Sequence, residues 1–525
     1  MSFIDFGFFV FLSAVFILYF IAPKKYRWLV LLLSSYVFYA LADIRMTALL
    51  IIITAVVFVC GIWMDNTHRK QKKLFDSMDA NWLKHNKKHA AARFMKKRRA
   101  ILLISLLTCF GTLAFLKYYN FAAINLNILG MNLPLFHTLL PLGISFYSFQ
   151  SLGYAIDIYR GKYPADRNFF KFALFVSFFP QIVQGPISRY DELARQLYAP
   201  NEFEYTRAKY GVQLIAWGYL KKLVIADRAF LLADLILTNF IDYSGAQVVL
   251  GLLAATLQVY TDFSGGIDIT RGIAQVLGID MPENFTRPFF SCSLSEYWRR
   301  WHITLGTWMR DYLLYPLSLS KPFGKLGKWS RKIMGNYFGK LFPTCLAMFV
   351  VFLAVGIWHG AEWRFIVFGI YNGIIIVGGI LIAPLVSAFQ KKHPNIRVDV
   401  PFWRVLICLK TFALVFIGKY FSAATDLSQA FALMKHSLFN FFSPSSKSAS
   451  LSETFGHKQF FIFFAMAVFL FFVSLFQERG LQIRDVLAKQ HIVIRWTVYF
   501  AILFLILIFA MDDTQQAKGF VYANF

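Results

Sequence analysis

Long apolar segments recur along this chain, and each is close to the length that crosses a bilayer. A membrane-spanning helix needs about 20 mainly apolar residues. The clear segments are 3–22, 28–45, 47–63, 101–118, 136–156, 341–358, 363–388, 402–422, 458–476 and 494–511. Others contain Gly, Pro or charge, which predicts short, tilted or re-entrant helices: 170–188, 208–226, 229–242 and 246–280. We therefore expect an all-α polytopic membrane protein with roughly 11 or more membrane helices.

The composition excludes several other classes of protein. Hydrophobic residues make up 58% of the 525 residues and charged residues only 16%, whereas soluble domains carry about 25% charged residues. This argues against a disordered chain, a coiled coil and a soluble enzyme. The formal net charge of +26 would suggest nucleic acid in a soluble protein, but here the basic residues lie between apolar segments, so we expect no nucleic-acid partner. The five cysteines form no CxxC pair, and no metal site is predicted.

The distribution of basic residues predicts the orientation of the chain. Residues 65–100 contain 12 Lys and Arg against 3 Asp, and such loops stay in the cytoplasm. Counting spans from this loop places the N-terminus outside. The basic segments 389–404 and 477–496 fall inside by the same rule, which places the C-terminus outside as well. We expect a multi-pass protein of the cell membrane.

The basic stretch 65–100 has two interpretations. It can be a solvated topology determinant that touches anionic lipid, or a docking site for an acidic partner. The sequence alone favours the first interpretation, because every cytoplasmic loop of a membrane protein shares this composition.

The segment 295–312 is the first candidate functional site. At helical spacing one side is aromatic and carries His302, and the other side is polar. The pattern predicts one amphipathic helix with three Trp and three Arg, which an interfacial anchor would explain. An anchor gives no reason for His302 to lie on the aromatic side, formed by Trp298, Trp301, Leu305, Met309 and Tyr312.

The second candidate site is GIWHGAEW at 356–363. His359 ends an apolar run, between glycines that permit close backbone approach, and Trp358 and Trp363 would wall the site. A helix-end histidine at the aromatic belt is the plainer alternative, but polar groups at membrane depth mark candidate sites. A similar but weaker pattern, GIYNG at 369–373, is interpreted as glycines that allow close helix packing.

Two histidines in apolar surroundings suit proton transfer. A neutral imidazole is the usual general base at neutral pH. Excluded water would also protect an activated thioester from hydrolysis. The expected topology places His302 near the inner face and carries His359 away from it, so the two could line opposite ends of one passage. Cys292 and Ser295 are interpreted as structural, and the alternating carboxylates at 262–268 as part of a kinked helix.

These motifs, taken in order along the chain, resemble the membrane-bound O-acyltransferase family. Within it the chain looks most like the membrane subunit of bacterial alginate O-acetylation systems. The matching strings are YVFYA at 36–40, LPLGISFY at 140–147, YAIDIYRG at 154–161, FFPQIVQGP at 178–186, LQVYTDFSG at 257–265, PENF at 282–285, WRRWH at 298–302, WMRDY at 308–312, GIWHG at 356–360 and GFVYANF at 519–525.

The resemblance implies a ring of helices around a central tunnel. It implies that His359 is the essential catalytic histidine and that His302 is the second signature histidine. Further residues would line the tunnel or shape it: Trp298, Arg299, Trp301, Arg310, Asp311, Trp358 and Asn372. It divides the chain into N-terminal spans at 1–64, a basic cytoplasmic loop at 65–100, a catalytic core at 101–390 and C-terminal spans at 391–525. The long basic insertion at 65–100 and Tyr371-Asn372 depart from the family pattern.

The resemblance also implies the partners. An acyl thioester, either acetyl-CoA or a phosphopantetheine carrier protein, would arrive from the cytoplasm as co-substrate, with no bound cofactor. The acyl group, most readily acetyl, would pass to an exported or cell-surface polysaccharide, directly or through an extracytoplasmic partner. A sister group transfers D-alanine to teichoic acid, which is the nearest alternative. A polytopic transporter or a scaffold for a polysaccharide synthase are alternatives of another class, although no internal repeat of the transporter type is visible.

Overall fold

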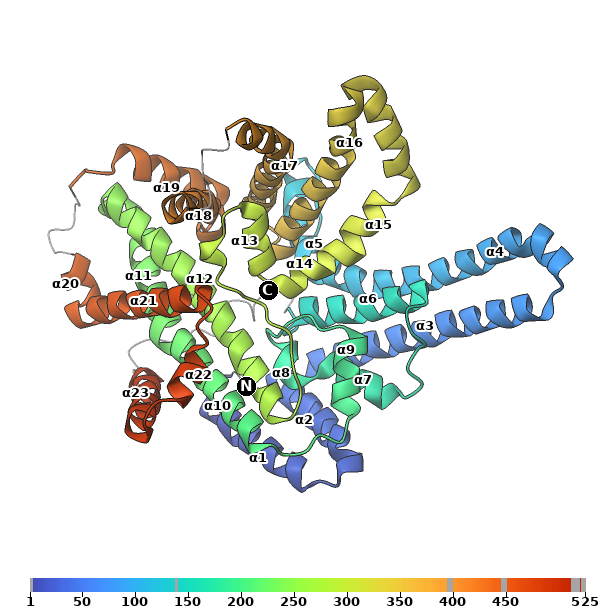
Figure 1. Cartoon of the computed structure of the whole chain (residues 1–525), viewed down its shortest axis with the longest axis horizontal. Coiled ribbons are helices and arrows are strands. Elements are labelled where there is room, and N and C mark those ends of the chain that lie inside the picture. The colour runs from blue at the N-terminus through green and yellow to red at the C-terminus, as the bar shows by residue number, and fades with distance from the viewer. Residues whose placement is uncertain (1–2, 137–139, 394–399, 445–450, 511–519, 521–525) are drawn as a thin grey trace. The chain divides into compact units, whose positions relative to one another are not determined.

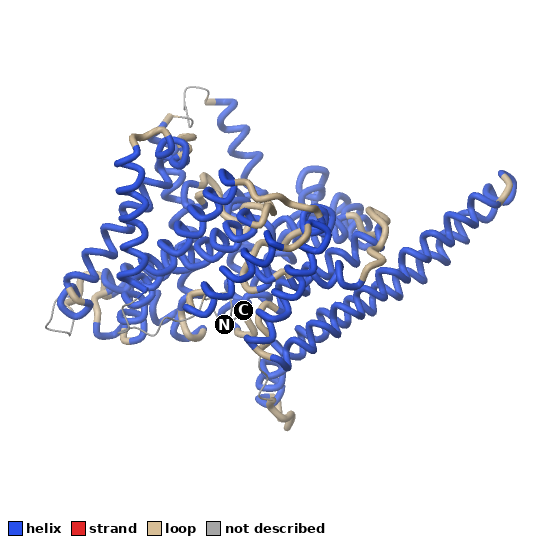
Figure 2. Tube along the Cα trace, turned by 90° about the horizontal axis from the view of Figure 1, so that it is seen from below, coloured by secondary structure: helices blue, strands red, loops and turns tan. Residues whose placement is uncertain are grey.

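The computed structural model describes residues 3–136, 140–393, 400–444, 451–510 and 520. Within these residues every regular element is a helix, and the one strand-like contact is an isolated bridge between Phe285 and Trp301. Figure 2 draws helices and loops throughout the described chain. The prediction of an all-α protein is confirmed. Of the aromatic ending predicted at 519–525, all but Phe520 lies outside the described residues.

Eight helical runs in the described part are long and apolar enough to cross a membrane. They are α3 (Ile44–Ser77), the run Ala80–Ile128, α12 (Gly245–Val276), α16 (Lys321–His359), α17 (Trp363–Lys392), α18 (Pro401–Ala423), α21 (His457–Glu478) and Ile492–Phe509 of α23 (Ile492–Ala510). Other predicted segments form shorter helices, so a number near 11 stays a prediction. The tunnel and the sidedness of the termini stay predictions as well.

The chain divides into two compact units. The first contains Met1–Ile215 with Thr270–Pro282, and the second contains Ala216–Ile269 with Glu283–Val521. This grouping does not test the four functional segments proposed from the sequence. The helices of the first unit are labelled in Figure 1: α1 (Phe6–Ile21), α2 (Arg27–Ala42), α3, α4 (Ala80–Leu106), α5 (Thr112–Ile128), α6 (Ile144–Arg160), α7 (Phe169–Ser177), α8 (Phe179–Ile182), α9 (Tyr190–Tyr198) and most of α10 (Tyr205–Tyr219).

Two of these elements differ from the predicted spans. The segment 136–156 forms a helix only from Ile144, and nearly every side chain of α6 is buried within its unit. Helix α6 carries polar groups that need protein partners, as when Gln150 Nε2 donates to the Phe175 carbonyl at 2.6 Å. The other case is the run Ala80–Ile128, in which a π-helical turn (Leu107–Gly111) joins α4 to α5.

The stretch 65–100, predicted as a basic cytoplasmic connection between two spans, is a helical hairpin in its backbone structure. Helices α3 and α4 lie side by side and turn at 78–79 (Figures 1 and 2). The side chain of Asp79 caps α4 by accepting a hydrogen bond from the Trp82 N–H at 2.7 Å. Lys, Arg and Ala are strong helix formers, so the charged composition extends the helix instead of ending it.

The second unit carries the remaining helices. They are α11 (Asp227–Thr238), α12 up to Ile269, α13 (Leu294–Arg300), α14 (Ile303–Met309), α15 (Tyr315–Ser318), α16, α17, α18, α19 (Leu427–Phe439), α20 (Leu451–Phe455), α21, α22 (Ile483–Ala488) and α23. The backbone of α16 reverses at Gly335, whose φ of 72° favours glycine. Ser330 Oγ donates to the Gly339 carbonyl at 2.7 Å across that turn, so the apolar part of α16 that ends at His359 starts after the turn.

Candidate active site

The segment 295–312 is two short helices and not the single amphipathic helix that its pattern predicts. Helix α13 ends at Arg300, and α14 begins at Ile303. Between them Trp301 is extended, and His302 has φ 47° and ψ 54°, in the left-handed region. The backbone therefore turns at the histidine, and His302 does not share a helical face with Trp298.

Long-range pairing with 284–286 explains the break. The Thr286 N–H donates to the Arg300 carbonyl at 3.0 Å, and the Ile303 N–H donates to the Asn284 carbonyl at 3.1 Å. The side-chain oxygen of Asn284 then accepts from the N–H and the hydroxyl of Thr304, at 2.9 and 3.0 Å. Asn284 thus caps α14 from outside the segment. Sequence reasoning gave Asn284 no role, since only a contact between distant residues reveals it.

His302 is buried, with 2% of its surface exposed. Its Nδ1 lies 3.3 Å from Asn284 Oδ1. Because that oxygen already accepts from Thr304, the histidine is the donor here, which leaves the lone pair on Nε2. The ring also meets the edge of Phe263 at a centroid distance of 4.8 Å. His302 lies outside the candidate spans, and burial, assisted by His359, lowers its pKa to about 3. The imidazole is therefore neutral at physiological pH.

His359 is the last residue of α16, next to a close crossing of α16 and α17. A Cβ placed on Gly356 would lie 2.5 Å from the Phe365 carbonyl oxygen and 2.7 Å from Gly369 Cα. This crossing brings α17 against the half-buried imidazole, which meets Phe365 at a centroid distance of 6.2 Å and Phe368 at 5.7 Å. Gly369 therefore has the packing role that the sequence predicted.

The indole of Trp358 brings the two histidines together. Its centroid lies 5.8 Å from His302 and 4.9 Å from His359. The two imidazoles therefore share one aromatic cluster. The expectation that they line opposite ends of a passage is wrong, because Trp358 contacts both rings.

Trp298 and Asn372 belong to the same neighbourhood. Trp298 Nε1 donates to Asn372 Oδ1 at 3.3 Å, and Asn372 Nδ2 donates to the Phe368 carbonyl at 2.8 Å. Phe368 in turn contacts both His359 and Trp298, the latter at 6.3 Å. The cluster that we call the histidine cluster thus contains His302, His359, Trp358, Trp298, Phe368 and Asn372.

The other predicted lining residues lie elsewhere in the second unit. Trp301 packs among aromatic rings, 5.0 Å from Phe285 and 5.6 Å from Tyr297. Arg299 is exposed, and Arg310, also exposed, donates to its neighbour Asp311 at 2.9 Å. A tunnel-lining role for Arg299, Arg310 and Asp311 stays a prediction.

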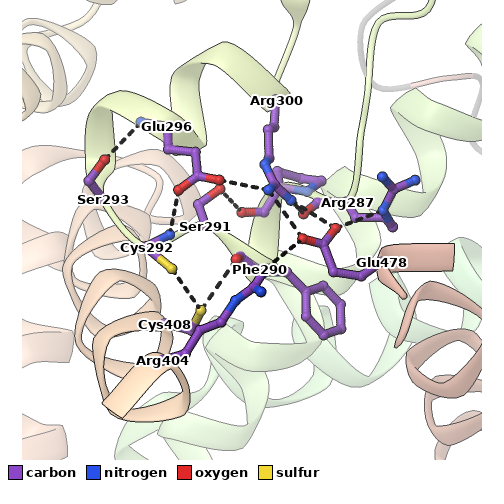
Figure 3. Close-up of polar contacts among 11 residues, drawn as sticks. Arg287, Phe290, Ser291, Cys292, Ser293, Glu296, Arg300, Arg404, Cys408 and Glu478 are labelled. Atoms are coloured by element: carbon purple, nitrogen blue, oxygen red, sulfur yellow. Dashed lines mark hydrogen bonds and ion pairs between the residues drawn. The ribbon is translucent and has the colours of Figure 1, made fainter. Parts of the chain in front are cut away.

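A carboxylate at the end of α21 holds the C-terminal end of α13, as Figure 3 shows. Glu478 accepts from Arg300 through both of its oxygens, at 3.0 and 3.2 Å, and from Arg287 at 2.9 Å and Arg404 at 3.3 Å. Such a paired arrangement is among the stronger ionic contacts in proteins. Glu478 was not singled out from the sequence, because it lies 178 positions from Arg300.

Cys292 and Ser295 have surroundings that fit their structural interpretation. Cys292 Sγ lies 3.6 Å from Cys408 Sγ, which itself donates to the Phe290 carbonyl at 3.2 Å (Figure 3). Ser295 is exposed.

The carboxylates at 262–268 lie on α12, which runs unbroken from Gly245 to Val276, and the predicted kink stays a prediction. Their partners are lysines of a π-helical segment, Leu220–Ala226. Lys222 Nζ lies 2.8 Å from both Asp262 and Asp227, and Lys221 Nζ lies 2.7 Å from Asp268. Phe263, which contacts His302, follows Asp262 directly, so these buried ion pairs fix the helix turn behind the histidine.

Comparisons with known proteins bear on the same residues. The family model described as MBOAT, membrane-bound O-acyltransferase family, matches residues 31–422. A probable alginate O-acetylase of Pseudomonas syringae pv. tomato is 35% identical over 373 residues, which is 70% of this chain and 63% of the relative. A peptidoglycan O-acetyltransferase of Helicobacter pylori is 29% identical over 365 residues, 64% of each chain.

A third relative is less similar to this chain. A teichoic acid D-alanyltransferase of Bacillus subtilis is 27% identical over 242 residues, 45% of this chain and 58% of the relative. The matched regions therefore span just under two thirds of the length of the Pseudomonas syringae and Helicobacter pylori relatives, and a smaller share of the Bacillus one.

Proposed function

Because the chain belongs to the membrane-bound O-acyltransferase family, we propose that it transfers an acyl group, most readily acetyl, from a thioester to a hydroxyl of an exported polysaccharide. The donor is acetyl-CoA or a phosphopantetheine carrier protein on the cytoplasmic side. The hydroxyl belongs to the polymer itself or to an extracytoplasmic partner that passes the acyl group on. The similarity to two O-acetylating relatives supports acetyl as the acyl group.

One observation carries this proposal: two imidazoles meet at one indole in aromatic, mainly buried surroundings. His359 is the base in the proposed reaction, since its side chain is half-buried and can be reached, whereas His302 is enclosed and donates to Asn284. A neutral His302 adds no positive charge beside His359.

The proposed step is a general-base acyl transfer. The His359 imidazole takes the proton of the acceptor hydroxyl as its oxygen attacks the thioester carbonyl. The tetrahedral intermediate collapses, the carbon–sulfur bond breaks, and the thiolate leaves with the proton from the imidazolium. The products are an ester and a free thiol. General base catalysis typically contributes about 10²–10⁴ in rate.

The test uses the purified chain in proteoliposomes with a labelled acetyl thioester and an acceptor polysaccharide. We expect His359→Ala to lower single-turnover transfer by at least about 10²-fold, while the protein remains folded. His393→Ala, which replaces an exposed histidine at the end of α17, is the matched control and should retain full activity. Full transfer by His359→Ala, or movement of an intact solute without transfer, would refute the proposal.

D-alanyl transfer to teichoic acid is the second candidate, favoured by the similarity to a D-alanyltransferase. The two candidates differ in the donor. Acetyl and D-alanyl thioesters offered together at equal concentration should label the acceptor with acetyl if the first proposal holds. Preferential D-alanyl labelling would replace it with the second.

A further inference from the structure

The distal part of the α3–α4 hairpin carries a dense set of unneutralised basic side chains. We call residues 65–100 the basic arm, and the structure describes every residue of it. The exposed basic residues of the arm are Arg69, Lys70, Lys72, Lys73, Lys84, Lys87, Lys88, Arg93, Lys96, Lys97 and Arg99. Its exposed acidic residues are only Asp76 and Asp79.

The arm is fixed to its unit at one end. Asp65 forms ion pairs with Arg69 and Arg167, and His68 Nε2 lies 3.0 Å from the Ile158 carbonyl. Farther out, the contacts given for the arm lie within the hairpin. Examples are Arg98, which donates to Gln71 at 2.5 Å, and Lys87, which lies over the ring of Phe75. Across residues 72–97 the structure gives no ion pair that would neutralise these charges.

Helix α4 carries a row of basic side chains on the face away from α3. Leu83, Ala90 and Phe94 are half-buried, and they lie at helical spacing on the face that packs along α3. The opposite face is basic from Lys84 to Arg99, a length of about 22 Å at the helical rise of about 1.5 Å per residue. Its members are Lys84, Lys88, Lys96 and Arg99, whereas Lys87 and Lys97 lie nearer to α3.

The arm is poorly suited to lie on a lipid surface. A helix in the membrane interface needs an exposed apolar face, and Met95 is the one large hydrophobic residue exposed in the arm. The arm also continues the spanning helix α3 without a break. The 13 residues from Asp65 to Ser77 extend about 20 Å, about twice the Debye length at physiological salt. The tip of the hairpin then lies beyond the reach of headgroups.

We propose that the basic arm is a docking surface for an acidic, water-soluble protein that presents carboxylates to the outer face of α4. The argument is charge complementarity. The arm exposes eleven cations and only two anions on its two helices, so its surface attracts a partner with exposed carboxylates. The docking surface does not depend on the proposed acyl transfer, and the two can fail separately.

Photo-crosslinking in cells identifies the partner. A benzophenone amino acid replaces Ala92, an exposed residue of α4, in the full-length chain, and mass spectrometry identifies what it captures. We expect an acidic soluble protein. Capture of lipid alone, or of nothing, would overturn the proposal in favour of a membrane-facing or purely topological role.

Binding of that purified protein is then measured to the full chain in nanodiscs of neutral phosphatidylcholine. One variant carries Lys84→Gln, Lys88→Gln, Lys96→Gln and Lys97→Gln, and its matched control carries Lys321→Gln, Lys325→Gln, Lys328→Gln and Lys332→Gln, which are equally exposed. We expect the arm variant to bind at least about tenfold more weakly, with the wild type and the control equal and both weakened by salt. Equal affinity of the arm variant would overturn the proposal.

Discussion

The histidine cluster and the basic arm both interrupt an otherwise apolar chain with polar residues, yet the structure treats them in opposite ways. In the cluster, polar groups are held by specific protein partners, such as Asn284 for His302 and Asn372 for Trp298. In the arm the charged groups point to solvent and have few partners. Function in the cluster should therefore depend on single atoms, whereas function in the arm should depend on summed charge.

The largest effect is expected where the cluster depends on close backbone contact. Gly356→Val would place side-chain carbon against backbone atoms of α17, so we expect loss of acyl transfer and a free energy of unfolding lower by about 1–3 kcal/mol or more. Gly378→Val on α17 is the matched control, since nothing lies within 4 Å of a Cβ there. Thermal unfolding in detergent checks both; equal stability of the two variants would show that the crossing is not a constraint.

The next effect concerns Asn284, which we regard as a positioning residue. Asn284→Ala removes the cap of α14 and the acceptor for His302, so we expect kcat to fall about 10- to 100-fold with little change in KM. Loss of the cap should lower stability by about 1 kcal/mol. Asn284→Asp keeps an oxygen acceptor and should restore most of the stability. An unchanged kcat in Asn284→Ala would show that Asn284 is not a positioning residue.

A smaller effect comes from the ionisation of His302. Its folded pKa of about 3 lies below the ordinary value of 6.5, so below pH 6.5 the unfolded chain binds a proton that the folded chain excludes. The free energy of unfolding should therefore fall as the pH drops from 6.5 to 5, by about 1.5 kcal/mol. His302→Asn should remove this part of the dependence. Parallel pH profiles for the two proteins, from thermal unfolding, would contradict it.

The smallest effect is expected for a single charge in the arm. Lys88→Gln should leave stability within about 0.5 kcal/mol of the wild type, and should change affinity for the captured acidic protein by less than about threefold. Binding and unfolding measurements check the two values. A loss as large as that of the fourfold variant would mean that the arm, like the cluster, acts through one specific contact.

The sequence predicted the class of fold, and it singled out several residues that the structure brings together in the histidine cluster. Apolar segments of membrane length, and histidines beside Trp and Gly, are local patterns. They can be recognised in the sequence because they do not depend on contacts between distant residues. They indicated His302, His359, Trp298 and Trp358 before any contact was known. The secondary structure of the arm was not predicted, because the positive charge was used only to assign topology although the residues favour a helix.

Residues that act over long distances could not be predicted in the same way. Asn284 breaks the expected amphipathic helix from 18 positions away, and Glu478 anchors Arg300 from 178 positions away. The helical period across 295–312 was correct as a pattern, but backbone pairing with 284–286 prevailed over it. Nothing in a single sequence ranks a distant pairing above a local period.

The backbone conformation at position 302 limits which side chains can replace the imidazole. With a φ of 47°, only Gly, Asn and Asp adopt the required geometry readily. A saturation library there, sorted first for correct insertion and then for catalysis, should retain mainly those three at the first sort and histidine alone at the second. Replacement by alanine mixes two defects, a strained turn and a missing ring, whereas asparagine isolates the second.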